Sequence, residues 1–502
     1  MASTLKLKAA LPLPRSESCH SHTSLPQPYE AQLRSLIPSL PTMGALGSFK
    51  DRIKSLVRRA SPKKAPAASV RLALEPAASA TTQDPQAVNS LWRPTEAQQK
   101  DIVTRDQSAL KKQNRAVQNV QAATTSGTLQ IVLENQSNNA DMYAYITGQA
   151  IDNNGALFLL QADARTPFYP SSPSSTGQPI PVNISIPLGA PGNKVNAVIP
   201  RIAGGRIWFS QGSQLTFLLN PGPGLVEPSV FNPADPNYNK NFGFSEFTFN
   251  SAQVFVNISY VDFVSNIPIA LTLQDTSGGI QRVAGMRANG LATVSQGLRD
   301  QTARDGQRWS SLIVQNNDQD LRALSPNSGI TNNPDWFSTY WTDYVNQVYA
   351  KYKNEDLTID TQAQWGEVKG RVGGDGVLDC GDGSRFPRPN AKDIFGNSTG
   401  PFATGGNAKT NAIIPRLAAA FNRSTLLLSN QTPNGTNPGQ YYQNSPTNHY
   451  SRLVHAANVD GIGYAFPYDD VTPDGGKPQE GAIFSLSPSS LTVTAGGNNA
   501  HA

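Results

Sequence analysis

The sequence predicts a mainly β protein with an α/β part, in which a mixed α/β domain is inserted into a β-sandwich or β-barrel domain. Three observations lead to this class. Glycine (41) and proline (38) are abundant and only 15% of the 502 residues are charged, which is typical of β-rich, turn-rich chains. Short apolar runs punctuated by turn residues occupy 128–285. Helical spacing begins near residue 286, and strand patterns return from residue 463.

The first of these segments is expected to form a series of short strands. Clusters of glycine, proline and asparagine separate the runs, and this rhythm favours an antiparallel sandwich or barrel. The runs are 129–135, 142–147, 158–161, 182–186, 205–210 and 215–219.

Helices are expected in the second segment, at 287–304 and 413–421. Asn333-Pro334-Asp335 has the composition of a helix start, with an N-cap residue followed by proline and an acid. A stripe of apolar and aromatic residues at helical spacing follows, and it favours a core role over a sugar platform. The stripe consists of Trp336, Phe337, Tyr340, Trp341, Tyr344, Val348 and Tyr352.

The order β–α–β predicts that the C-terminal strands, 482–486 and 490–493, rejoin the first β domain. We therefore expect a β domain over 127–285 with 456–495, and an inserted mixed α/β domain over 286–455. Residues 1–126 are expected to be a disordered basic tail with a linker helix, since residues 1–72 hold 12 Lys/Arg against 3 Asp/Glu.

Charge and cysteine content exclude several classes of function. Outside residues 1–72 the chain holds 29 Lys/Arg and 33 Asp/Glu, which argues against a nucleic acid as its main ligand. The two cysteines, Cys19 and Cys380, form no metal-site spacing, so neither a metal nor another cofactor is expected. The sequence contains no run of 18 apolar residues, so no membrane span is expected. We also expect a monomer.

A predicted hairpin carries the first candidate catalytic residue, Glu246. Period two places Glu246, Thr248 and Asn250 on one face of the strand 244–250 and turns Phe247 and Phe249 to the core. The next strand, from Val254 to Tyr260, completes the polar face with hydrogen-bonding groups and one aromatic ring. These residues are Phe255, Asn257 and Ser259.

The second candidate, Asp262, does not follow this pattern. Pairing Phe249 with Val254 places Glu246 opposite Asn257, and Asp262 then lies five residues further along, about 17 Å away in a straight strand. Inverting glycosidases separate their carboxyl groups by about 6.5–9.5 Å. A working pair therefore requires a bulge or sharp bend near 260–261, because a regular strand would point Asp262 into the core. The alternative interpretation is that both acids are solvated strand carboxylates.

The residues around both acids carry a family resemblance. Ser245-Glu246-Phe247-Thr248-Phe249-Asn250 and Ser259-Tyr260-Val261-Asp262-Phe263, with Asn266-Ile267-Pro268, resemble two segments of the thaumatin-like superfamily. Gly205-Arg206-Ile207-Trp208 resembles its Gly-Arg-x-Trp strand, although the scarcity of cysteine departs from plant members. The closer resemblance, over 128–495, is to glycoside hydrolase family 64, the cysteine-poor thaumatin-like β-1,3-glucanases, of fungal type.

This resemblance implies an endo-acting, inverting enzyme with a groove between its two domains. Glu246 would be the general acid and Asp262 the general base, while Thr248 and Asn250 would bind glucosyl hydroxyls. Such roles require a raised pKa for Glu246 and an ionised Asp262. Phe247 and Phe249 are expected to supply apolar surroundings for Glu246. Asp469 and Asp470 would line the other side of the groove, and a role in a β-turn remains equally open for them.

Two functions from different classes remain open at this point. The first is an endo-β-1,3-glucanase that hydrolyses laminarin or cell-wall glucan without a cofactor. The second is a non-catalytic thaumatin-like protein that binds β-1,3-glucan in the cell wall. The resemblance implies a secreted or cell-wall location, and intracellular action or unconventional export stays open because no signal peptide is recognisable at the start of the sequence.

Overall fold

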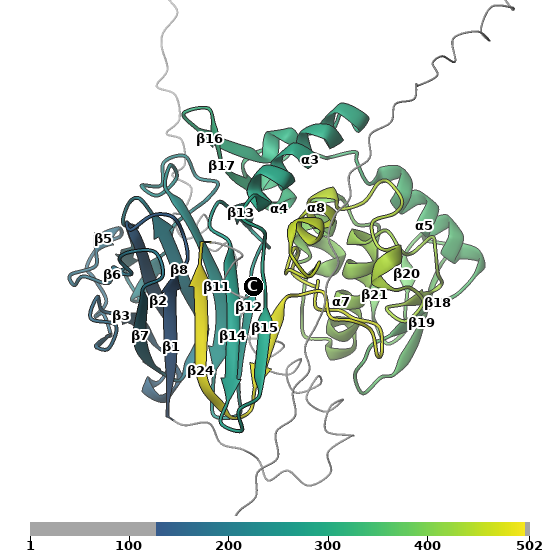
Figure 1. Cartoon of the computed structure of the whole chain (residues 1–502). Helices are drawn as coiled ribbons and strands as arrows, with labels where there is room; N and C mark the ends of the chain where they lie inside the picture. Colours follow the sequence, from purple (N-terminus) through teal and green to yellow (C-terminus); the bar gives the residue numbers. More distant parts are fainter. Residues whose placement is uncertain (1–126, 497–502) are drawn as a thin grey trace, which may run out of the picture. The chain divides into compact units, whose positions relative to one another are not determined.

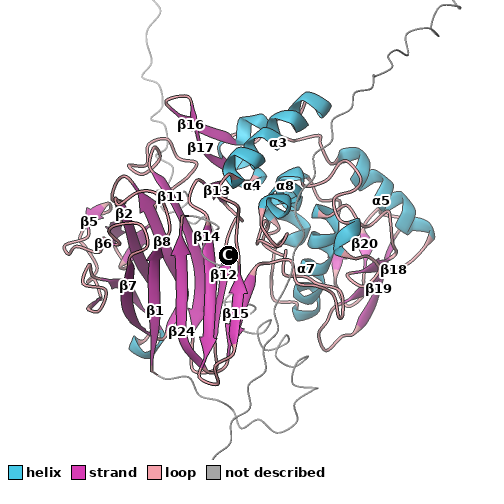
Figure 2. Cartoon of the chain, in the orientation of Figure 1, coloured by secondary structure: helices cyan, strands magenta, loops and turns pink. Residues whose placement is uncertain are grey.

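The computed structural model describes residues 127–496. The expected basic tail and linker helix, residues 1–126, lie outside the described residues. The described part is mostly β with several helices, and Figures 1 and 2 show its strands and helices. Within residues 127–496, no helix is long and apolar enough to cross a membrane.

A five-stranded sheet has the C-terminal strand at its centre (Figure 1). Its order is β15-β14-β24-β1-β7, and β24 runs parallel to β1, with Leu133 paired to Val493, and antiparallel to β14. The predicted return of the C-terminus to the first sheet is therefore confirmed. The strands are β1 (Thr128–Asn135), β7 (Lys194–Pro200), β14 (Ile269–Asp275), β15 (Ile280–Val283) and β24 (Pro488–Ala495).

The second sheet carries the predicted hairpin. Its order is β23-β12-β11-β8-β2-β3-β4, and β6 pairs with β2. Its strands are β2 (Met142–Ala150), β3 (Ala156–Leu160), β4 (Pro167–Phe168), β6 (Ile186–Pro187), β8 (Ile202–Gln211), β11 (Asn241–Phe249), β12 (Val254–Ile258) and β23 (Ala482–Ser485). A three-stranded sheet lies apart in β5 (Gln178–Pro179), β9 (Leu218–Asn220) and β10 (Gly224–Val226). One contiguous apolar core joins both larger sheets, through residues such as Ile131, Phe247 and Leu271.

The predicted hairpin register is confirmed. Phe249 pairs with Val254 and Glu246 pairs with Asn257 in the antiparallel β11–β12 ladder. Phe247 and Phe249 are buried, whereas Glu246, Thr248 and Asn250 are half-buried. Alternation along a strand with one face on the core therefore sets the direction of Glu246.

The strand bends before Asp262, as the pairing of the two acids requires. β12 ends at Ile258, and β13 (Phe263–Ser265) leaves this sheet to pair with β17 (Gln319–Leu324). Between them Ser259 forms a bridge with Tyr464, and the Tyr260 N–H donates to the carbonyl of Tyr464 at 2.8 Å. The chain thus exchanges one set of strand partners for another over four residues, and Asp262 lies at the change of direction.

Helices and short strands occupy most of 286–457. A three-stranded sheet β13-β17-β16 contacts α3. A five-stranded sheet has the order β21-β20-β19-β18-β22. The elements are α3 (Gly290–Asp305), β16 (Ile313–Asn316), α4 (Pro326–Asn332), α5 (Thr342–Asn354), β18 (Leu357–Asp360), β19 (Glu367–Val372), β20 (Leu378–Asp379), β21 (Arg385–Phe386), α6 (Ala391–Gly396), α7 (Ala408–Asn422), β22 (Gln431–Thr432) and α8 (His449–Ala457). The 3₁₀ turns are η1 (Ile151–Asn153), η2 (Ser310–Leu312), η3 (Gly400–Phe402) and η4 (Pro438–Gln440).

The expected helix start at Asn333 is wrong. Asn333 instead ends α4, and α5 begins at Thr342. Phe337, with a φ of 60°, lies in the left-handed region and interrupts any helix there. The core role of the aromatic residues is confirmed, because Phe337 and Trp341 are buried and Phe337 packs on Trp309 with ring centroids 4.7 Å apart. The division of the chain at 127, 286 and 456 stays a prediction.

Candidate active site

Glu246 lies in the middle of β11, on the face opposite the core. Its neighbours across the sheet are Arg206 of β8 on one side and Asn257 of β12 on the other. The Glu246 side chain is 21% exposed, so part of it reaches solvent. A carboxylate in such a position can exchange a proton with a bound molecule.

The guanidinium of Arg206 is shared by two carboxylates. Its Nε and Nη2 each lie 3.3 Å from Oε1 of Glu246, and its Nη1 lies 2.5 Å from Oε2 of Glu227. The same group lies over the ring of Phe244 at 4.8 Å and that of Trp208 at 5.5 Å. Arg206 is only 13% exposed, so this positive charge is held in place by aromatic rings and acids together.

Asp262 belongs to the same group of charges. Burial raises the pKa of the Asp262 carboxyl to about 6, with Glu246 and Glu227 adding to the rise and Arg206 opposing it. Its backbone carbonyl accepts hydrogen bonds from the Ser325 N–H at 2.9 Å and from the Ser328 hydroxyl at 3.0 Å. The bend therefore brings Asp262 into electrostatic contact with Glu246, which a regular strand would not do.

The pKa of Asp262 differs from the expectation. The raised pKa falls on Asp262, which the resemblance assigns as the ionised base. Phe247 and Phe249 lie on the core face of β11, so the expectation that they surround the Glu246 carboxylate is wrong. The physical reason is the period of two: residues at odd spacing from Glu246 point to the other side of the sheet.

Five residues predicted to contact glucan lie on or next to the same hairpin. Asn250 uses Oδ1 to accept from the N–H groups of Ala252 and Gln253, both at 2.9 Å, so it closes the β11–β12 turn. Asn257 is 6% exposed, beside Glu246. The others, Thr248, Phe255 and Ser259, are half-buried.

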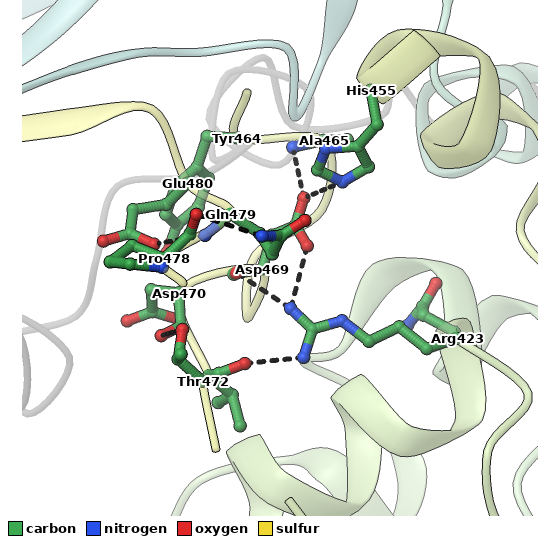
Figure 3. Close-up of polar contacts among 12 residues, drawn as sticks. Arg423, His455, Tyr464, Ala465, Asp469, Asp470, Thr472, Pro478, Gln479 and Glu480 are labelled. Atoms are coloured by element: carbon green, nitrogen blue, oxygen red, sulfur yellow. Dashed lines mark hydrogen bonds and ion pairs between the residues drawn. The ribbon is translucent and has the colours of Figure 1, made fainter. Parts of the chain in front are cut away.

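Asp469 is fully buried, and its carboxylate holds several groups together (Figure 3). Oδ1 lies 3.0 Å from Nη2 of Arg423, and Oδ2 lies 2.9 Å from Nε2 of His455 and 3.1 Å from the Ala465 N–H. Burial opposes ionisation, yet His455 and Arg423 leave the pKa of Asp469 below its ordinary value. With no exposed oxygen, Asp469 orders the segment that follows Tyr464, whereas Asp470 is partly exposed.

A third carboxylate near this segment, that of Glu480, is partly exposed (Figure 3). Burial raises its pKa to about 8, and Asp470 and Asp469 add to the rise. Among residues 127–496, no group of three or more His, Cys, Asp or Glu side chains is arranged to hold a metal ion. The charged groups near the hairpin include the carboxyl groups of Glu246, Glu227 and Asp262 and the guanidinium of Arg206.

Two members of the site, Arg206 and Glu227, were not predicted as functional residues. Arg206 appears in the sequence only within a Gly-Arg-Ile-Trp strand, and its place opposite Glu246 depends on pairing strands 40 residues apart. Glu227 follows the short strand β10, and no periodic pattern in the sequence there indicates a functional residue. A correct prediction of the β8–β11 register would have placed Arg206 opposite Glu246, but no feature of the sequence indicates Glu227.

Comparisons with known proteins agree on one family. The family described as "Beta-1,3-glucanase", glycoside hydrolase family 64, matches residues 127–495. A relative from Cellulosimicrobium cellulans, named glucan endo-1,3-beta-glucosidase, is 30% identical over 392 residues, covering 75% of this chain and 68% of its own. A second relative with that name, from an Arthrobacter strain, is 29% identical over 388 residues and covers 74% and 67%.

Solved structures of the same family resemble the described fold. A laminaripentaose-producing β-1,3-glucanase, solved with laminaritetraose, is similar with a TM-score of 0.66 and 31% identity over 74% of this chain and 100% of its own. A β-1,3-glucanase domain from Clostridium beijerinckii shares the fold, with a TM-score of 0.57 and 21% identity over 74% and 99%. With a family match over most of its length, the chain belongs to glycoside hydrolase family 64 and is a glycoside hydrolase.

Proposed function

We propose that this protein is an endo-β-1,3-glucanase that hydrolyses β-1,3-glucan with inversion at the anomeric carbon. One observation carries the proposal: Glu246 on β11 and Asp262 at the bend before β13 share one group of charges around Arg206. A pair of carboxyl groups is what glycosidic hydrolysis requires. The substrate is supported by the relatives, two named glucan endo-1,3-beta-glucosidase and one solved with laminaritetraose.

The proposal includes the substrate site. A glucan chain would lie over the exposed face of the β11–β12 hairpin, in a groove between a thaumatin-like β domain and the mixed α/β part. Thr248, Phe255, Asn257 and Ser259 would contact it, with Asn250 at the turn and Asp470 on the other side. Asp469, being buried, would act only by ordering the segment that carries Asp470.

In the reaction, Glu246 donates its proton to the glycosidic oxygen as the bond from that oxygen to the anomeric carbon breaks. Asp262 takes a proton from a water molecule whose oxygen attacks the anomeric carbon from the opposite face. The free protein has a raised pKa at Asp262 and an ion pair between Glu246 and Arg206. The assignment therefore requires that bound glucan weaken this ion pair and that the attacking water solvate Asp262.

Hydrolysis of laminarin by Glu246→Gln and Asp262→Asn tests the proposal. Each variant should lose about 10²–10⁴-fold in kcat, because each lacks one partner of the proton transfer. Reducing-sugar release measures the loss, and NMR of the first product should show the α-anomer. A β-anomer, or wild-type rates in either variant, would refute the assignment.

A fluoride substrate distinguishes the two carboxyl roles. A β-laminaribiosyl fluoride needs no protonation of its leaving group, so the variant lacking the acid should hydrolyse it while the variant lacking the base should not. We expect activity in Glu246→Gln and none in Asp262→Asn. The opposite result would exchange the roles of the two residues, as the raised pKa of Asp262 in the free protein favours.

The remaining parts of the proposal concern catalytic activity itself, the oligomeric state and the cellular location. A wild-type protein that binds laminarin but releases no sugar would instead be a non-catalytic glucan-binding protein. We propose a monomer that acts outside the cell or in the cell wall, since its substrate is a wall polysaccharide. Light scattering tests the first statement, and activity in the culture medium compared with that in cell extract tests the second.

A further inference from the structure

Glu227 makes the shortest contact to the charged centre of the site, and nothing in the hydrolytic scheme uses it. Its Oε2 lies 2.5 Å from Nη1 of Arg206, compared with 3.3 Å for the contacts between Arg206 and Glu246. We propose that Glu227 is a positioning residue of the hydrolytic site: by holding Arg206, it determines how strongly that guanidinium acts on Glu246 and Asp262. This inference rests on the proposed function.

Aromatic rings, as well as the two acids, hold the guanidinium of Arg206 in position. It is covered by the rings of Phe244 and Trp208, and Trp208 is itself buried, with 1% of its surface exposed. The Arg206 side chain is 13% exposed and that of Glu227 is 32% exposed. One fixed positive charge is therefore divided between two carboxylates, and the closer contact with Glu227 leaves Glu246 the weaker share.

The charges that face this centre come from four segments. They are Arg206 on β8, Glu227 after β10, Glu246 on β11 and Asp262 at the bend. From α8, Tyr450 also faces Asp262, and its hydroxyl donates to the Tyr260 carbonyl at 2.6 Å. Burial, with Asp262 nearby, raises the pKa of Tyr450 well above its usual range, so it stays neutral where the carboxyl groups titrate.

Substitutions that change the charge in opposite senses should shift the pH–rate profile in opposite directions. Glu227→Gln removes one negative charge, so Arg206 is less neutralised and favours ionised Glu246 and Asp262. Arg206→Gln removes the positive charge and favours their protonated forms. The two substitutions should therefore shift both limbs of the pH–rate profile, the first to lower pH and the second to higher pH, whichever acid is the proton donor.

The experiment measures kcat/KM on laminarin across pH for the wild type and four variants. Glu227→Gln should shift the profile down by about 1 pH unit and Arg206→Gln up by about 1, as a nearby charge does. Arg206→Lys keeps the charge and should stay close to the wild type. Glu134→Gln is the matched control, because Glu134 is also ion-paired, to Lys194 at 3.2 Å, but lies on β1 in the other sheet.

A second measurement needs no activity. Carboxyl ¹³C NMR of protein with labelled aspartate, with Asp262→Asn to assign the signal, gives the pKa of Asp262 directly. It should fall from about 6 in Glu227→Gln and rise in Arg206→Gln. The inference would be overturned if Glu227→Gln left both the pKa of Asp262 and the pH–rate profile unchanged, or shifted them upward. Failure of the proposed function is separate, since it would appear as wild-type activity in Glu246→Gln or as no activity in the wild type.

Discussion

At the scale of single residues, the surroundings of Asp262 decide its chemistry. Its carboxyl lies near Glu246 and Glu227, and burial raises its pKa to about 6 despite Arg206. A half-buried acid with a raised pKa, beside other charged groups, is typical of functional sites. Nothing in the residues Tyr260-Val261-Asp262 indicates this, because the neighbours come from β8, β11 and α8.

This raised pKa makes the stability of the protein depend on pH. The pKa of Asp262 is about 6 when folded against an ordinary 3.8, so its stabilising contribution is complete below about pH 4 and is lost as pH rises through about 6. We therefore expect Asp262→Asn to melt at a higher temperature than the wild type at neutral pH, with the difference disappearing below about pH 4. Thermal unfolding followed at several pH values measures it.

Asp163→Asn provides a control of opposite sign. The hydroxyl of Thr166 and nearby N–H groups lower the pKa of Asp163 to about 2, so its contribution is present above 3.8 and lost as pH falls towards 2. That variant should therefore lose stability at neutral pH. Neutral-pH melting of Asp262→Asn at or below the wild-type temperature would contradict the raised pKa.

At the scale of elements, the β8–β11 ladder positions the site. It aligns Arg206 with Glu246 and, one residue earlier on β8, Gly205 with Phe247 on the core face. A Cβ at Gly205 would lie 2.4 Å from the Phe247 ring, so this glycine permits the close approach of the buried ring. The alternation predicted from the sequence holds here, but the close approach of β8 to β11 follows only from the fold.

Gly205→Ala should therefore destabilise the protein by about 1–3 kcal/mol, because the added methyl overpacks a buried ring. Chemical denaturation measures the loss, and Gly205→Ala with Phe247→Leu should recover part of it. Gly374→Ala is the control, since a Cβ there has no atom within 4 Å. Equal stability of the Gly205 and Gly374 variants would mean that the ladder tolerates a wider separation than the structure has.

At the scale of the whole molecule, the ends of the described chain meet in one sheet. β24 lies between β1 and β14, and β23 extends the sheet that carries the hairpin. Val493 is fully buried and pairs with both Leu133 and Leu271. Folding of the described part therefore depends on strands more than 300 residues apart, which favours slow, cooperative assembly.

Removal of residues 488–502 should abolish cooperative folding, because it leaves the edges of β1 and β14 unpaired and their core face open. Circular dichroism and a thermal melt would show the loss. A chain ending at residue 496, which keeps β24, should melt like the full protein. A sharp transition in the shorter chain would show that β24 is dispensable.

The sequence by itself determined the local features of this protein. The hairpin, its register and the direction of Glu246 follow from period two with one face on a core, and the residues beside both acids indicated the family. Helix boundaries were less predictable: the start expected at Asn333 failed because Phe337 adopts a left-handed conformation in a packed aromatic cluster. Propensity at a cap is weak beside tertiary packing.

Only the tertiary structure decided which charged groups lie near one another. Asp262 turns towards Glu246 because Tyr464 and β17, both distant in sequence, provide new hydrogen-bond partners after Ile258. Arg206 and Glu227 join them through pairing and packing that no local pattern encodes. Hydrophobic periodicity records which side of a strand faces the core, whereas proton affinity depends on charges brought together from the whole chain.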